Sequence, residues 1–177
     1  ETLKNNGPDD LKEHCLKMAG HMLLLAGKVS TISAGSNLAK QTLLDGSAFN
    51  EFIKLVEAQN GHKKYLYDPK QLNQAKLTST ITTNIEGYVE TMNALNIGKA
   101  SVILGAGREH KEDPIDLDAG IILHQKVGSY VKIGDPLFTI YSNKEDKIAL
   151  AKEETLKGIK VTVNEIAQLP LHYDVVE

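Results

Sequence analysis

The chain has 177 residues, of which 41% are hydrophobic and 24% charged, so it is long enough for one large or two small domains and too apolar for intrinsic disorder. A net charge of −3 excludes the clustered basic excess of nucleic-acid-binding proteins, and the longest apolar run, residues 22–26, is far too short for a membrane span. We therefore expect no nucleic-acid or membrane partner. The single cysteine, Cys15, fits a reducing, cytoplasmic compartment.

The chain starts with the features of a helix end. Residues 1–8 are typical of a last helical turn followed by Gly7 and Pro8. The first residue is Glu1 rather than Met, and no signal-peptide pattern follows it. Because a helix end stands here without its beginning, we expect a chain cut from a longer one.

The next 50 residues predict helices. Apolar residues recur at steps of four and three from residue 11 and predict a helix that buries Cys15, with a capping box formed by Asp10 and Glu13. This helix is apolar over so much of its circumference that we expect it inside a larger body than two neighbours provide. Two further helices are expected, from after residue 36 to about 46 and from 47 to about 61.

A connection without sustained period, residues 60–76, separates this helical part from a β-rich part. Alternation over residues 77–85 predicts a strand that ends at Glu86 and Gly87. A helix at 145–156, capped by Asn143, is expected near the end of the chain. The other expected elements are a helix at 96–104 and strands at 115–117, 121–124, 130–133, 137–141 and 159–163.

A glycine-rich loop follows the predicted helix at 96–104. Gly105, Gly107 and Arg108 are residue types that hold phosphate, but the loop lacks the Lys-Ser/Thr of a P-loop and the third glycine of a dinucleotide site. A tight structural turn is therefore favoured. The neighbouring His110 and Lys111 lie in a charge run that is compatible with a metal or acid–base site, although a solvated loop is the preferred interpretation.

Elsewhere the sequence carries no recognisable catalytic pattern. Its histidines are scattered, there is no H-E-x-x-H or G-x-S-x-G motif, and no second cysteine completes a zinc set. We assign no catalytic, substrate-binding or metal-ligating residue in this chain.

Residues 127–140, VGSYVKIGDPLFTI, resemble the half-motif of biotinyl and lipoyl carrier domains. In those carriers a modified lysine follows at a tight turn, and Lys144 falls close to that place. Its surroundings lack the Met-Lys-Met of biotin carriers, and a helix is expected to start there. A carrier domain modified on Lys144 therefore stays as the alternative function.

Several short segments, taken together in this order, closely resemble pyrimidine-nucleoside phosphorylases and their thymidine phosphorylase sisters. The segments are NGPDDL at 6–11, MAGHM at 18–22, DGSAF at 45–49, EAQNG at 57–61, EGYV at 86–89, LGAGR at 104–108, IDL at 115–117, AG at 119–120 and the 127–143 stretch. The resemblance runs to about residue 158 and corresponds to the C-terminal two-fifths or so of a family member.

The resemblance implies an α+β fold in three parts. Residues 1–60 would be the helical remainder of the family's central, phosphate-binding α/β domain, and residues 61–76 a linker. Residues 77–177 would be the C-terminal α+β domain with a barrel-sandwich-hybrid core, related to the biotinyl and lipoyl carriers.

The resemblance also implies a reaction, cleavage of a pyrimidine nucleoside by inorganic phosphate to the free base and (deoxy)ribose 1-phosphate. The family's Lys-His-Ser-Thr-Gly-Gly phosphate loop and its base-holding residues are not found in this sequence, so we expect the chain alone to be inactive and to hold no cofactor. The family's potassium site and its homodimer contacts would lie upstream. If any residues approach the active site on domain closure, we expect them in the loop with Gly105, Gly107, Arg108, His110 and Lys111.

Overall fold

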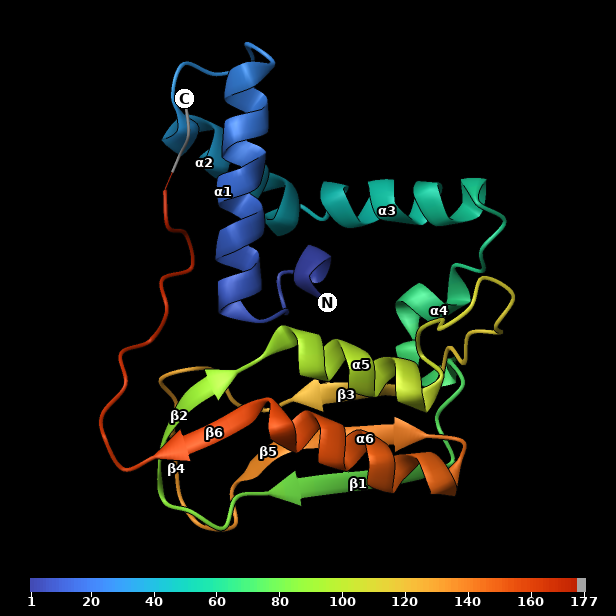
Figure 1. Ribbon diagram of the computed structural model, residues 1–177. Coiled ribbons are helices and arrows are strands. Elements are labelled where there is room, and N and C mark those ends of the chain that lie inside the picture. The colour runs from blue at the N-terminus through green and yellow to red at the C-terminus, as the bar shows by residue number, and fades with distance from the viewer. Residues whose placement is uncertain (175–177) are drawn as a thin grey trace. The chain divides into compact units, whose positions relative to one another are not determined.

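A computed structural model describes residues 1–174 of the chain (Figure 1). The chain divides into two compact units. The first consists of Glu1–Leu72 together with the segment from Pro170, and the second of Asn73–Leu169. In the described part of the chain, no helix combines the length and the apolar character needed to cross a bilayer.

The first unit is helical. Its longest helices, α1 and α2, pack against each other through two buried glycines, Gly20 and Gly35. Ser36 fixes the same crossing, because its hydroxyl donates to the Leu16 carbonyl at 3.0 Å. The elements are a short 3-10 helix Thr2–Lys4, α1 Asp9–Leu25, α2 Ile32–Leu44, α3 Ser47–Ala58, α4 Lys64–Tyr67 and a second 3-10 helix Pro69–Gln71.

Helix starts in this unit differ from the sequence prediction. The N-cap of α1 is Pro8 and no side chain caps it, so the predicted capping box is wrong. Helix α2 begins before residue 36, because the Thr31 hydroxyl accepts from the Ala34 amide at 3.1 Å and caps the helix there. At the chain start Asn5, with φ 60°, takes the left-handed position after the 3-10 helix.

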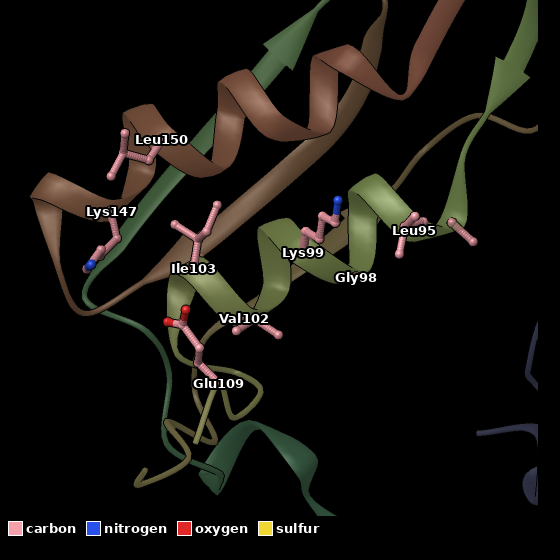
Figure 2. A pocket seen from close by; sticks show the side chains of 9 residues that line it. Leu95, Gly98, Lys99, Val102, Ile103, Glu109, Lys147 and Leu150 are labelled. Atoms are coloured by element: carbon pink, nitrogen blue, oxygen red, sulfur yellow. The ribbon is translucent and has the colours of Figure 1, made fainter. Parts of the chain in front are cut away.

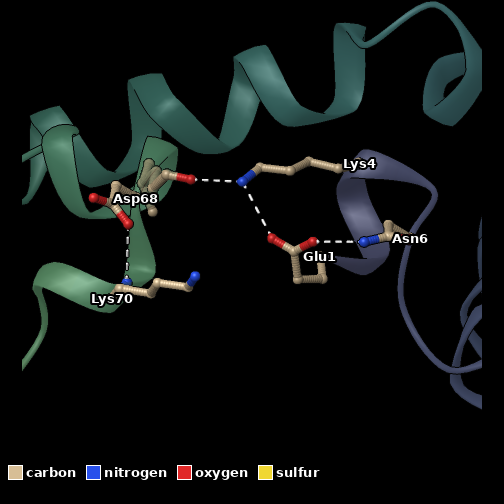
Figure 3. A network of polar contacts seen from close by, with 6 residues as sticks. Glu1, Lys4, Asn6, Asp68 and Lys70 are labelled. Atoms are coloured by element: carbon tan, nitrogen blue, oxygen red, sulfur yellow. Dashed lines mark hydrogen bonds and ion pairs between the residues drawn. The ribbon is translucent and has the colours of Figure 1, made fainter. Parts of the chain in front are cut away.

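The start of the chain is tied to α4 by polar contacts (Figure 3). Lys4 Nζ donates to the Leu66 carbonyl at 2.7 Å and to Glu1 Oε1 at 3.2 Å. The Asn6 amide donates to the other oxygen of Glu1 at 3.0 Å. Hydrogen bonds from Asn6 and Lys4 lower the pKa of the Glu1 carboxyl.

One side of α1 is exposed, and Cys15 lies on it rather than in a core, so the predicted burial of this thiol is wrong. The neighbouring Leu11 and Met22 on α1 are 47% and 68% exposed. The apolar period identified the helix correctly, but a period does not show whether a partner covers the helix.

The second unit is α+β and contains two three-stranded antiparallel sheets, ordered β1-β5-β3 and β4-β2-β6. Helices α5 and α6 pack side by side and against these strands (Figure 1). The elements are β1 Leu77–Thr82, β2 Gly87–Met92, α5 Ala94–Leu104, β3 Gly120–Leu123, β4 Tyr130–Val131, β5 Pro136–Ser142, α6 Glu145–Lys157 and β6 Ile159–Thr162.

The core of the second unit is built around β5. Phe138 and Ile140 are fully buried in it, and they pack in a cluster with Leu104 of α5 and Ala151 of α6. Because β5 is the middle strand of its sheet, most of its residues are buried on both faces.

The β-rich part follows the predicted order with specific corrections. The strand expected at 115–117 is not formed, and β2 was not predicted. Strand β2 carries Glu90, whose charge weakened its apolar pattern; in the structure Lys160 Nζ lies 2.7 Å from the Glu90 carboxylate. The predicted Asn143 cap is also wrong, because Lys144 is the N-cap of α6.

Candidate functional site

The candidate site is the loop formed by residues 105–116 (the 105–116 loop), which begins where α5 ends. Gly105 is in the left-handed region with φ 93°, a conformation that favours glycine. Its amide donates to the Val102 carbonyl at 2.9 Å, and the Ala106 amide donates to the Ser101 carbonyl at 3.0 Å. The glycine therefore ends the helix and turns the chain into the loop.

The two ends of the loop are joined, as in a compact Ω-loop. The Asp116 amide donates to the Gly105 carbonyl at 2.8 Å. Within the loop, Asp113 Oδ2 accepts from the backbone amides of Glu109 at 3.1 Å and His110 at 2.7 Å. Asp113 therefore shapes the loop by binding its backbone.

The structure places all five sequence-predicted loop residues on this one segment. Arg108, His110 and Lys111 are exposed, whereas Gly105 and Gly107 are half-buried against the end of α5. The amides at 105, 106, 109 and 110 are all used in internal bonds, so these four amides are not turned toward a phosphate. Among residues 1–174 no three His, Cys, Asp or Glu side chains converge as a metal site.

A groove of about 640 Å³ lies beside the loop (Figure 2). Its walls come from α5 and α6, and Glu109 of the 105–116 loop stands at one end. Lys99 and Lys147 add positive charge to a largely apolar lining. The lining residues are Ala94, Leu95, Gly98, Lys99, Val102, Ile103, Glu109, Lys147 and Leu150.

A hydrogen bond fixes the two walls of the groove relative to each other. The Asn96 amide of α5 donates to Glu154 Oε1 of α6 at 2.9 Å. This bond, supported by Lys157, lowers the pKa of the Glu154 carboxyl.

Sequence reasoning missed the polar contact at the base of the loop. Asn143 Nδ2 lies 3.1 Å from both carboxylate oxygens of Asp116, and Asn143 Oδ1 accepts from the Lys76 amide at 3.0 Å. Because Asn143 is 27 residues from Asp116, no local spacing pattern signals this contact.

Three of the scattered histidines, and Lys144, have structural partners or positions of their own. His124 Nε2 lies 2.7 Å from the Thr139 hydroxyl, and His14 Nδ1 lies 3.2 Å from His172 Nε2. Lys144 is exposed and directly precedes α6, so it does not occupy the hairpin tip of a carrier lysine. The geometry does not favour a carrier domain modified on Lys144.

Residues 88–162, which include the 105–116 loop, match the family described as pyrimidine nucleoside phosphorylase C-terminal domain. The chain is also 37% identical over 174 residues, or 98% of its length, to the pyrimidine-nucleoside phosphorylase of Geobacillus stearothermophilus. Residues 88–162 therefore form the C-terminal domain of the pyrimidine-nucleoside phosphorylase family. This confirms the resemblance found in the short sequence segments.

Two other members of the family give the same result. The pyrimidine-nucleoside phosphorylases of Bacillus subtilis (strain 168) and Staphylococcus aureus (strain USA300) are each 38% identical over 146 residues, or 82% of this chain. The chain spans 40% of the length of the Geobacillus relative and 34% of these two.

Proposed function

We propose that this chain acts as the C-terminal part of a pyrimidine-nucleoside phosphorylase, in nucleoside salvage or catabolism in the cytoplasm. The observation that carries the proposal is the 37% identity to such an enzyme over 98% of the chain. The substrates would be a pyrimidine nucleoside and inorganic phosphate. The active enzyme would be a homodimer joined through a helical domain that this sequence does not contain, with a potassium ion held by residues outside it.

The proposed reaction exchanges one bond for another at the anomeric carbon. A phosphate oxygen forms a new C–O bond while the C–N bond to the base breaks, and the base leaves with the bonding electron pair and takes up a proton. Catalysis requires that phosphate is positioned and that negative charge on the departing base is stabilised. We assign neither task to a residue of this chain, so its contribution is to support and close the site.

The second unit would be the domain that moves. Its two antiparallel sheets and the left-handed Gly128 and Gly134 support a barrel-sandwich-hybrid core. The Gly134 amide donates to the Thr83 carbonyl at 2.9 Å, and the Thr83 amide donates to the Asp135 carbonyl at 3.0 Å, so the turn between β4 and β5 is bonded to the chain just past β1. A rigid domain of this kind can close over substrate as one body.

The 105–116 loop would reach the substrate side on closure. Arg108 supports this, because it is exposed on a loop whose ends are fixed. In the full-length enzyme, we expect Arg108→Ala to lower kcat/KM, while Lys28→Ala, which removes an exposed cation from the first unit, leaves it unchanged. An unchanged kcat/KM in Arg108→Ala would remove the loop from the mechanism.

The activity of the isolated chain tests the proposal. We expect no uracil release when the 177-residue chain is incubated with uridine and phosphate. Phosphate-dependent release by this chain would show that catalytic residues lie within it and would overturn the assignment.

A further inference from the structure

Asn143 connects three segments of the second unit that are distant in sequence. It stands between the end of β5 and the start of α6, accepts from the Lys76 amide just before β1, and contacts Asp116 at the end of the 105–116 loop. The bond from Lys76 fixes the orientation of the side-chain amide. Its oxygen faces a backbone donor, so its nitrogen faces the Asp116 carboxylate.

Asp116 is the point at which the loop is anchored. Its carboxylate accepts from Asn143 Nδ2 at 3.1 Å and from the Asp118 amide at 3.1 Å. Its own amide donates to the Gly105 carbonyl at 2.8 Å. The loop base is therefore joined to the end of α5 through the backbone and to the β5–α6 corner through Asn143.

We infer that Asn143 is a positioning residue, which acts through Asp116 to hold the base of the 105–116 loop so that Arg108 and its neighbours are presented from a fixed place. The role in catalysis rests on the proposed function, whereas the anchoring of the loop does not. Asn143 itself touches no reacting group. It holds the residue at which the loop ends, and the Asp116–Gly105 backbone bond holds the place where the loop starts.

The polarity of the pair provides a matched test. Asn143→Asp removes the donor and places a second carboxylate against Asp116, so the two charges repel at neutral pH. In the double variant Asp116→Asn/Asn143→Asp, donor and acceptor are exchanged. The new Asn at 116 can donate to the new Asp at 143, which still accepts from the Lys76 amide, and the contact is restored.

The rate of tryptic cleavage measures how well the loop is held, because Arg108 and Lys111 are cleavage sites within it. We expect Asn143→Asp to raise the rate of cleavage after these residues by about tenfold or more, as follows from leaving a half-buried carboxylate without its partner. The double variant should return to within about twofold of the parent chain. Cleavage in α1 serves as the internal control and should not change.

An unchanged cleavage rate in Asn143→Asp, or a double variant as susceptible as Asn143→Asp, would overturn the inference. Should Asn143→Asp lose its cooperative melting, Asn143→Ser, which removes the bridge without adding charge, replaces it under the same criteria.

Activity of the full-length enzyme separates this inference from the proposed function. Loop protection here means resistance to tryptic cleavage after Arg108 and Lys111. If both the anchoring and the proposed function hold, Asn143→Asp lowers kcat/KM and loop protection, and the double variant restores both. If loop protection responds but kcat/KM does not, the anchoring stands and the catalytic role of the loop fails. If loop protection does not respond, the anchoring fails whatever the activity.

Discussion

The crossing of α1 and α2 depends on the absence of a side chain at Gly20. A Cβ built there would lie 2.6 Å from the Ile32 carbonyl oxygen and 3.0 Å from the Ser36 amide nitrogen, both backbone atoms that a rotamer change cannot move. Relief from 2.6 Å to 3.4 Å, where ordinary contact begins, requires the helices to separate by about 0.8 Å. Overpacking of this kind costs about 1–3 kcal/mol, and the better helix propensity of alanine offsets about 1 kcal/mol. We expect the difference, a destabilisation of the first unit by up to about 2 kcal/mol, in Gly20→Ala.

Gly98 supplies the matched control. It also lies inside a helix, α5, but a Cβ there meets no atom within 4 Å. Gly98→Ala should therefore stabilise the second unit by about 0.5–1 kcal/mol. Urea unfolding followed by circular dichroism measures both variants, and hydrogen exchange assigns each change to its helices. A Gly20→Ala chain that gains as much stability as the Gly98→Ala chain would refute the close-approach reasoning.

Three further perturbations test other parts of the structure. Phe138→Ala, which empties a fully buried site in the core, should cost about 3–5 kcal/mol in urea unfolding. The Tyr130 hydroxyl donates to Glu86 at 2.5 Å, and this bond raises the pKa of Tyr130. The bond therefore stabilises the fold below the ordinary pKa of tyrosine, and this contribution is lost as pH rises through the raised pKa of Tyr130. Ultraviolet titration should show that Glu86→Gln lowers the pKa of Tyr130. The pKa of His172 is lowered by partial desolvation and by the nearby Lys17 and His14. The contact between His172 and His14 therefore contributes its full stability above the ordinary pKa of histidine, and this contribution is lost as pH falls through the lowered pKa of His172. NMR titration should show that His14→Ala raises the pKa of His172.

The sequence predicted those helices and strands whose formation follows from the spacing of apolar residues alone. The alternation from Leu77 to Ile81 gave β1, and the helical period gave α1, because these periods depend only on which face is apolar. Boundaries set by a single side chain were less predictable. The start of α2 depends on the Thr31 hydroxyl, and the cap of α6, though not its first residue, was misassigned because the amide of Asn143 binds Asp116 and Lys76 instead of capping the helix.

The loop shows the same limit at the level of the candidate site. Gly105 and the charge run were visible in the sequence, and they located the loop. Its shape depends on Asp113 and Asp116, whose carboxylates bind backbone amides and a side chain from a distant segment. Such long-range pairing leaves no local period, so the anchoring at Asn143 is visible only in the three-dimensional structure.

Phosphate-dependent release of uracil from uridine tests the proposed function most directly, when it is measured on a polypeptide in which this chain replaces the two-fifths of the Geobacillus stearothermophilus enzyme that it matches. Circular dichroism and a cooperative melting transition establish that the joined polypeptide is folded. We expect it to release uracil only when phosphate is present, and the 177-residue chain to release none under the same conditions. A folded joined polypeptide without activity, or release by the chain alone, would contradict the proposed function.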